Sequence, residues 1–269
     1  MSESETSAGA LFRSGELQPA IAAAGQAVRA SPTDFGARVV LAELLLFAGN
    51  LERADVILDA AATADPGTAV VVAEFRQLLR GETARRQLRR DGRVPEFLGE
   101  PTAAQKQSLL AMVALRAGDV AAAAAAAAAA EAARPHVQGR ADALAFDDFR
   151  DVDDICAGSF EVLTTTGKYY WIPVERMVSI DFHPPKRPRD LFWRRASVSV
   201  HEGPDGDVYI PVVYGSEATD IADELRLGRA TDWQQDGDGP VRGVGQRMFL
   251  AGEEALGIME LASLSFGQG

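Results

Sequence analysis

The densest group of chemically competent side chains in this sequence is a run of aspartates near the middle of the chain. Its members are Asp147, Asp148, Asp151, Asp153 and Asp154. Carboxylate oxygens suit Mg²⁺ and Ca²⁺, so one alternative function is a metal-dependent hydrolase that uses Asp151, Asp153 and Asp154. The run lacks the glycine and the distal glutamate of an EF-hand loop. A solvated linker, or a set of ion-pair partners for arginines, is the better interpretation.

A second group mixes basic and aromatic residues over Lys186–Arg195. Such a mixture can bind RNA through phosphate contacts and base stacking, which gives another alternative function. The charge balance opposes it, because residues 145–269 hold 12 Lys/Arg against 22 Asp/Glu. We therefore expect Leu191, Phe192 and Trp193 to pack in the core or at a domain interface, with their arginine neighbours paired to local acids.

Other signatures of catalysis are missing from the sequence. It has no P-loop, no GxSxG, no HExxH and no dinucleotide-binding glycine motif. Its three histidines, His136, His183 and His201, are far apart, and the single cysteine, Cys156, has no recognisable base partner. We expect a protein that is not an enzyme, with no cofactor, no metal and an inert thiol.

An internal repeat with a period of 34 residues organises the first half of the chain. Six residues recur at that offset: Gly15, Leu17, Ala20, Ala27, Ala30 and Pro32 return as Gly49, Leu51, Ala54, Ala61, Ala64 and Pro66. This period is that of the tetratricopeptide helix–turn–helix. A weaker third copy runs from Gly118 to Pro135, across an unbroken alanine run at 121–130. Small residues at the repeated positions would let the paired helices approach closely.

Stacked helical hairpins form a solenoid whose inner curve can receive a partner helix. The residues expected to border that groove are Arg38, Glu43, Phe47, Arg76 and Arg80. The last two belong to a long helix predicted from Thr68 to about Arg90, which is rich in arginine. That helix face is either solvated, which we favour, or the wall of a groove for an acidic or helical partner.

The pattern changes beyond about Arg140 to that of strands and turns. Runs rich in β-branched and aromatic residues predict strands, with hairpins expected at Thr166-Gly167 and Glu202–Asp207. The predicted strands are Phe160–Thr165, Lys168–Pro173, Met177–Phe182, Ala196–His201, Val208–Val213, Arg247–Ala251 and Gly257–Leu264. A short helix is expected within Asp220–Gly228 and a loop at Asp236–Pro240.

The predicted fold class is therefore α+β. Residues 1–10 are expected to be a disordered lead-in, 11–140 a tetratricopeptide-like helical domain and 141–269 a mainly antiparallel β-rich domain. With 47% hydrophobic and 25% charged residues the composition is that of a globular protein. A net charge of −12 argues against nucleic acid as a partner. There is no apolar run long enough to span a membrane and no secretory signal, so we expect a cytoplasmic protein.

The second half resembles the ImpE/TagJ family of type VI secretion accessory proteins. The similarity is strongest over Gly167–Pro173 (GKYYWIP) and continues through Pro184-Pro185 and Arg189–Trp193 (RDLFW). Phe97–Pro101, Asp151–Asp154, Ile210–Tyr214, Trp233 and Gly245–Arg247 follow the family's order. The opening Leu11–Leu17 is also similar. The alanine run and the Asp236–Pro240 loop depart from the family pattern.

The resemblance implies a non-enzymatic, cytosolic adaptor. Its implied partner is a helix of the small sheath subunit, TssB, with a link to sheath recycling by the AAA+ ATPase ClpV. It carries no catalytic residue over to this chain. The oligomeric state and the task of the β-rich part stay open.

Overall fold

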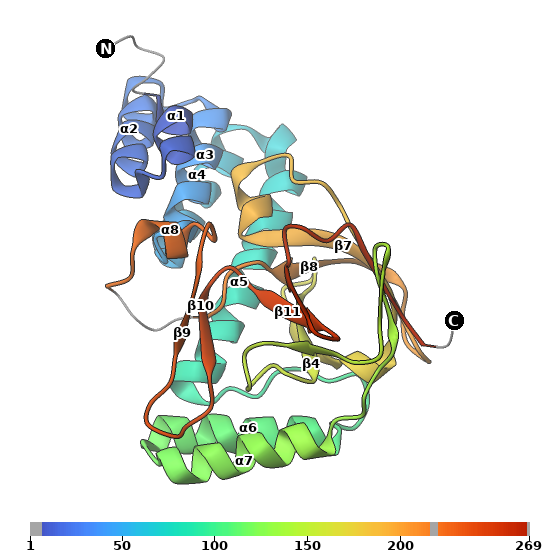
Figure 1. Cartoon of the computed structure of the whole chain (residues 1–269). Coiled ribbons are helices and arrows are strands. Elements are labelled where there is room, and N and C mark those ends of the chain that lie inside the picture. The colour runs from blue at the N-terminus through green and yellow to red at the C-terminus, as the bar shows by residue number, and fades with distance from the viewer. Residues whose placement is uncertain (1–6, 216–219, 268–269) are drawn as a thin grey trace.

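Helices fill the first half of the chain and strands the second half, as the sequence predicts. The computed structural model describes residues 7–215 and 220–267. Within them the first half contains α1 (Ala8–Ser14), α2 (Leu17–Ala30), α3 (Phe35–Phe47), α4 (Leu51–Ala64), η1 (Pro66–Thr68), α5 (Ala69–Asp91), α6 (Ala103–Ala117) and α7 (Val120–Ala133). The helices α1 to α4 stack at one end of the molecule, and α5 runs from them past the sheet towards α6 and α7 (Figure 1).

The repeated glycines are required by the turn between paired helices. Gly15, Gly49 and Gly118 have φ of 92°, 77° and 73°, which is the left-handed region that side chains disfavour. Each ends a helix with the same two hydrogen bonds, from its own N–H and from that of the next residue. Close approach of the helices depends instead on the alanines, because Ala20 and Ala54 are fully buried.

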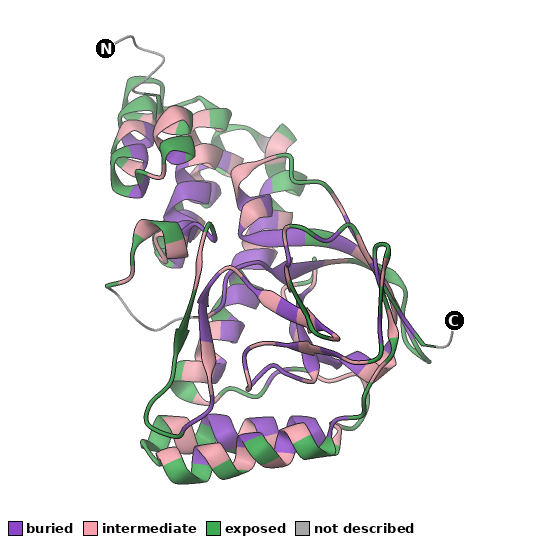
Figure 2. Ribbon diagram, in the orientation of Figure 1, coloured by how far each residue is buried: buried purple, intermediate pink, exposed green. Residues whose placement is uncertain are grey.

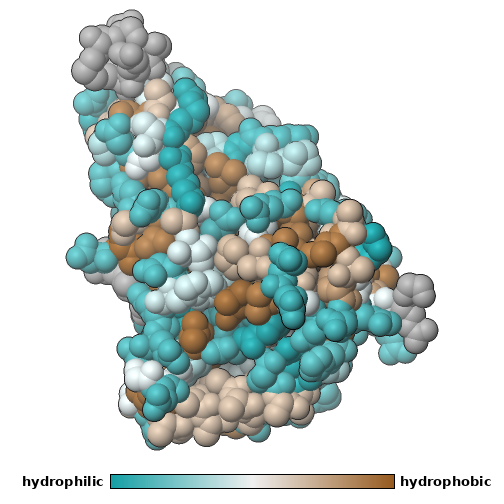
Figure 3. Space-filling view, viewed as in Figure 1, coloured by the Kyte–Doolittle hydropathy of each residue, from teal (hydrophilic) through white to brown (hydrophobic). Residues whose placement is uncertain are grey.

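The third copy of the repeat forms a hairpin of its own. Its helices α6 and α7 pack against each other at the far end of α5, well away from α1–α4 (Figure 1). Ala123, Ala127 and Ala130 face inward, and the outward side of α7 is a light brown, nearly uncharged band along the lower edge of the molecule (Figure 3). The first two copies are therefore separated from the third by the length of α5.

The β-rich part consists of short strands, and every pairing between named strands is antiparallel. An eight-stranded sheet has the order β2-β1-β13-β6-β7-β8-β4-β5, a three-stranded sheet the order β12-β11-β3, and β9 pairs with β10. The elements are β1 (Gly139–Ala141), β2 (Leu144–Phe146), β3 (Phe149–Asp151), β4 (Ser159–Leu163), β5 (Tyr169–Pro173), η2 (Val174–Arg176), β6 (Met177–Phe182), η3 (Pro188–Leu191), β7 (Trp193–Val200), β8 (Gly206–Pro211), α8 (Asp223–Arg226), β9 (Thr231–Gln234), β10 (Arg242–Gly245), β11 (Met248–Ala251), β12 (Glu254–Gly257) and β13 (Ser263–Phe266).

Three boundaries differ from those expected. The helix α1 begins at Ala8, capped by the Ser7 side chain, so residues 8–10 are helical, while residues 1–6 lie outside the described chain. The segment 257–264 is not one strand: β12 ends at Gly257, where the Glu260 carboxylate accepts the Gly257 N–H, and β13 begins at Ser263. The strand β1 begins at Gly139, just before the expected domain boundary.

One continuous hydrophobic core joins the two halves. The buried residues of α5 face β4 and β5, and the purple segments of α5, β4 and β8 in Figure 2 lie together at the centre of the molecule. Phe149, Phe160, Phe249 and Phe266 form an aromatic cluster between the two larger sheets, with ring centroids 5.2–5.9 Å apart. Helical repeats and sheet therefore depend on each other for burial. Among the described residues, no helix is long and apolar enough to cross a bilayer.

Candidate functional site

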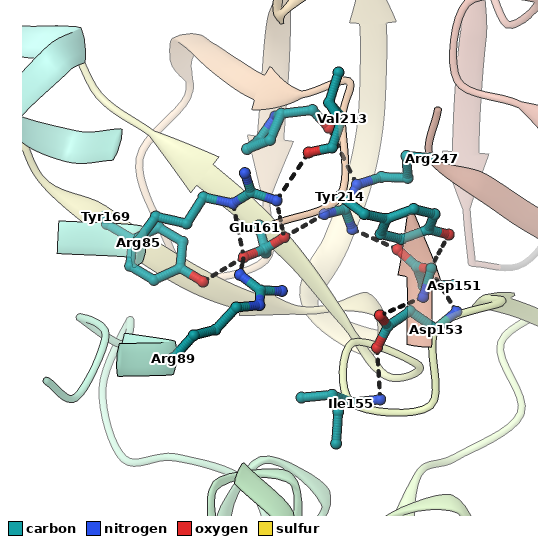
Figure 4. A network of polar contacts seen from close by, with 12 residues as sticks. Arg85, Arg89, Asp151, Asp153, Ile155, Glu161, Tyr169, Val213, Tyr214 and Arg247 are labelled. Atoms are coloured by element: carbon teal, nitrogen blue, oxygen red, sulfur yellow. Dashed lines mark hydrogen bonds and ion pairs between the residues drawn. The ribbon is translucent and has the colours of Figure 1, made fainter. Parts of the chain in front are cut away.

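A fully buried carboxylate, that of Glu161 on β4, faces the middle of α5. Arg85 on α5 donates to both of its oxygens, from Nε at 3.0 Å and from Nη2 at 2.9 Å. Arg247, which just precedes β11, donates to the same carboxylate from the other side (Figure 4). Burial raises the pKa of Glu161, but Arg85, Arg89 and Arg247 together hold it well below its ordinary value. The carboxylate is therefore ionised and ties α5 to the sheet.

The network continues through Arg247 to the aspartate run. Arg247 donates to Asp151, whose carboxylate also accepts the Tyr214 hydroxyl at 2.7 Å and the Asp153 backbone N–H at 2.9 Å. Burial raises the pKa of Asp151 to about 6, against the opposing effect of Arg247. Figure 4 shows these side chains as one continuous network of polar contacts that extends from α5 to Asp153.

On the helix side, Glu82 of α5 extends the same network. It accepts the indole N–H of Trp193 at 3.1 Å and forms ion pairs with Arg85 and Arg86. Trp193 begins β7, so a second strand is anchored to α5. Such buried ion pairs fix the relative position of their elements, because breaking one leaves a charge without a partner.

The aspartates of the run, which the alternative hydrolase function would use for a metal, are occupied by other partners. Asp153 accepts the N–H groups of Ile155 and Gly243, both at 2.9 Å, and Asp154 binds Arg150 at 2.7 Å. Asp148 pairs with Arg134 at 2.7 Å. Within residues 7–215 and 220–267 no group of three His, Cys, Asp or Glu is placed to hold a metal ion. The interpretation as ion-pair partners of arginines describes the observed contacts, and nothing in the geometry favours the hydrolase.

The basic and aromatic segment Lys186–Arg195 packs onto the helices. Phe192 makes an edge contact with Phe47 of α3, and Trp193 makes one with Phe75 of α5. Arg189 is buried with its guanidinium 4.6 Å from the Phe75 ring centroid. The aromatic residues of the segment thus lie at the interface between the two halves, as expected. They are therefore unavailable for stacking on RNA bases.

This packing corrects the expectation of an open inner curve. The η3–β7 segment of the same chain packs against α3, and its Arg189 and Trp193 contact Phe75 of α5, on the side of the repeats where a partner groove was expected. Glu43 and Phe47 of α3, expected at a partner groove, are both buried beneath it. Burial raises the pKa of Glu43 to about 7, with Arg189 Nη1 3.8 Å from its Oε1.

The other three expected groove residues lie nearer the surface. Arg76 spans to α4, where it pairs with Asp55 at 2.7 Å and with Asp59 at 2.6 Å. Arg80 is exposed further along α5, and the Arg38 Nε donates to the Pro32 carbonyl at 2.9 Å. The structure therefore does not bring the five residues to one open surface. Their role in partner binding stays a prediction.

A serine, a histidine and an aspartate also meet on the outer side of the sheet, although the sequence separates them. The Ser197 hydroxyl lies 2.9 Å from His183 Nε2 and donates to Asp207 at 2.7 Å. A nucleophilic triad needs the carboxylate on the second ring nitrogen of the histidine. Here Asp207 binds the serine and Arg195 instead, so the arrangement is an exposed polar cluster.

A cleft lies beside the buried network, between α5 and the β-rich part. It consists of two adjoining cavities of about 380 and 630 Å³, which share Arg89, Arg90 and Gly215 in their walls. The smaller cavity extends to α6 and β10 and the larger one to the ends of α3 and α8. No local sequence signal indicated this cleft, because its walls come from segments far apart along the chain.

The fold and the site define a tetratricopeptide-repeat protein whose repeats are joined to an antiparallel β-rich part by buried ion pairs. A tetratricopeptide repeat model matches residues 11–76, and the model of the ImpE protein family matches residues 144–265. A type VI secretion system accessory component, TagJ of Pseudomonas aeruginosa PAO1, is 30% identical over 258 residues, covering 95% of this chain and 89% of TagJ.

A solved structure matches this chain over nearly its whole length. The crystal structure of protein VPA1032 from Vibrio parahaemolyticus matches with a TM-score of 0.91 and 26% identity, covering 97% of this chain and 98% of that one. The chain belongs to the ImpE/TagJ family. The resemblance found in the sequence is thereby confirmed.

Proposed function

We propose that this chain is a cytoplasmic accessory protein of a type VI secretion system that acts by binding other proteins and not by catalysis. The observation that carries the proposal is its similarity to TagJ, an accessory component of such a system, over nearly the full length of both chains. The tetratricopeptide repeats support it, since this architecture presents helical surfaces to partners.

The proposed partner is a helix of the TssB-like small sheath subunit, with a link to sheath recycling by a ClpV-like ATPase. The covered inner curve leaves the outer side of the repeats for such a helix. Three exposed valines lie on the two helices that follow α3: Val56 on α4 (65%), and Val70 (81%) and Val71 (44%) in the first turn of α5. We call these three residues the valine surface. An amphipathic helix recognises its groove through such apolar anchors.

Charged side chains lie on the same two helices as the valine surface. Arg76, paired with Asp55 and Asp59, bridges α4 and α5, and Arg80 is exposed one turn further along α5. Charges at the rim of an interface set orientation and association rate more than affinity. In this proposal Arg76 and Arg80 belong to the partner site at its rim.

The test is a titration of the full chain with a peptide of the N-terminal helix of the cognate TssB-like subunit. We expect binding with a Kd at or below about 100 µM, or roughly −5.5 kcal/mol. The double variant Val70→Asp/Val71→Asp is expected to bind at least about tenfold more weakly, because it places charge where apolar contact is needed.

The matched control is Leu110→Asp/Val113→Asp, which adds the same two charges at two exposed apolar residues (54% and 52%) on the distant helix α6. It should bind the peptide like the unchanged protein. Failure of the unchanged protein to bind the peptide at ~100 µM would count against the proposed partner. Equal losses in both variants would contradict the valine surface.

A further inference from the structure

The smaller cavity of the cleft has a strongly cationic wall. Four arginines line it, Arg89 and Arg90 of α5, Arg116 of α6 and Arg242 of β10, so guanidinium groups come from three different elements. The carboxylate in the same wall, that of Asp153, is already engaged by the N–H groups of Ile155 and Gly243. Among the described residues the lining therefore holds four arginines and one carboxylate, while Arg242 pairs with Asp236 and Arg89 with Glu161 outside it.

Arg89 is the innermost of these cations. Its side chain is 14% exposed, and its Nη1 is buried without a hydrogen-bond acceptor among residues 7–215 and 220–267. The nearest carboxylate oxygen, Oε1 of Glu161, is 3.6 Å away and already accepts from Arg85 and Tyr169. Nη1 of Arg89 thus has an ion-pair partner but no hydrogen-bond acceptor among the described residues. A buried donor left in this way is costly, and in native proteins it usually has an ion, water or ligand beside it.

Three further observations show that the position of these donors is built into the chain. A Cβ on Gly215 would lie 2.3 Å from the Arg89 Nη1, so the absence of a side chain there makes room for the guanidinium. Arg242 donates from Nη2 to Asp236 at 2.7 Å, while its Nε is buried without an acceptor among the described residues. Arg116 is fixed by its bond to the Leu88 carbonyl at 3.0 Å.

We propose that this cavity binds a small ligand through a phosphate group. Guanidinium groups that approach from three elements require acceptor oxygens in several directions, which a tetrahedral phosphate has and a planar carboxylate lacks. A volume of about 380 Å³ accommodates inorganic phosphate, pyrophosphate or a small phosphate ester. The site is distinct from the valine surface and does not depend on the proposed secretion partner.

The experiment is a calorimetric titration of the full chain with inorganic pyrophosphate at low ionic strength, with citrate as the carboxylate probe. We expect pyrophosphate to bind with a submillimolar Kd and citrate at least about tenfold more weakly. Arg242→Gln and Gly215→Ala should each weaken pyrophosphate binding at least about tenfold. The first removes a partly exposed cation, and the second displaces Arg89.

The control is Arg80→Gln, which removes an exposed arginine of α5 that does not line the cavity. It should leave the pyrophosphate affinity unchanged, and circular dichroism with the thermal midpoint verifies that each variant is folded. If Gly215→Ala is not folded, Arg242→Gln alone decides. The proposal is overturned by the absence of binding at 5 mM pyrophosphate (on the order of −3 kcal/mol), by equal affinity in Arg242→Gln, or by citrate binding as tightly as pyrophosphate.

Discussion

Glu161 is the carboxylate on which three guanidinium groups from two parts of the chain converge. Arg85 and Arg89 reach it from α5, and Arg247 reaches it from the loop before β11. Arg247 is shared with Asp151, and Arg85 is shared with Glu82, so the positive charges do not accumulate around a single acid. This balance explains how so many charged groups are buried at the joint between repeats and sheet.

Replacement of Glu161 tests the importance of this joint. Glu161→Gln removes the negative charge opposite the buried arginines and replaces one acceptor oxygen by an NH2 donor, and we expect the free energy of unfolding to fall by roughly 3–5 kcal/mol. The measurement is urea denaturation followed by circular dichroism. Glu131→Gln is the control: its carboxylate is 42% exposed and pairs with Arg134, so its loss should cost less than about 1 kcal/mol. Similar losses in both variants would contradict the account.

Glu43 predicts a specific dependence of stability on pH. Burial raises its pKa from 4.5 to about 7, so the fold favours the neutral carboxyl. The contribution of the neutral Glu43 carboxyl to the free energy of unfolding is therefore complete below pH 4.5 and is lost as the pH rises through 7. Glu43→Gln has no carboxyl to ionise, so the variant does not lose this stability as the pH rises. Between pH 4.5 and 8 the stability of the variant should rise relative to the unchanged protein by roughly 3 kcal/mol. A difference that stays constant over this range would show that Glu43 titrates normally.

At the scale of elements, the repeat could be predicted because each recurring residue has a local task. The glycines end helices in a conformation that other residues resist, and the prolines follow the second helix of each pair. These tasks are set by neighbours within a few residues, so the sequence shows them directly. The role of the glycines is nevertheless conformational, and the close helix contact expected of them is provided by alanine.

Two glycines should respond to alanine with opposite signs. Gly49→Ala places a side chain at φ 77° and should lower the free energy of unfolding by about 1–2 kcal/mol. Gly25→Ala lies within α2, where the nearest atom to the new Cβ, Nη1 of Arg29, is 3.8 Å away. It should raise stability by roughly 0.5–1 kcal/mol. Thermal melts of both variants measure the two changes, and shifts of equal sign would contradict this explanation.

Strands were harder to delimit than helices. Apolar and β-branched runs predicted β4 to β8 within a few residues. The segment 257–264 was predicted as a strand because it is apolar, and Ile258 and Leu261 are indeed buried. They lie in the turn between β12 and β13, so burial there does not come from a strand. Periodicity over so few residues cannot distinguish a buried turn from a buried strand.

At the scale of the whole molecule, the site depends on contacts that the sequence does not show. Arg85 and Arg247 lie 76 and 86 residues from Glu161 along the chain. A run of arginines on a helix looks the same whether it faces water or a buried carboxylate. The cover over α3 and α5 comes from η3, more than a hundred residues later, so the open inner curve was a reasonable but incorrect expectation for stacked repeats.

Because η3 and the start of β7 pack over α3, we propose that a partner helix docks outside, at the valine surface. Hydrogen exchange of the full chain, with and without the TssB-like helix peptide, distinguishes docking at the valine surface from docking against α3. We predict slower exchange on binding in residues 51–80, which contain α4 and the start of α5, and unchanged exchange in residues 188–193. Faster exchange in 188–193 together with protection of α3 would show that the peptide displaces the sheet segment and binds inside, which contradicts the account.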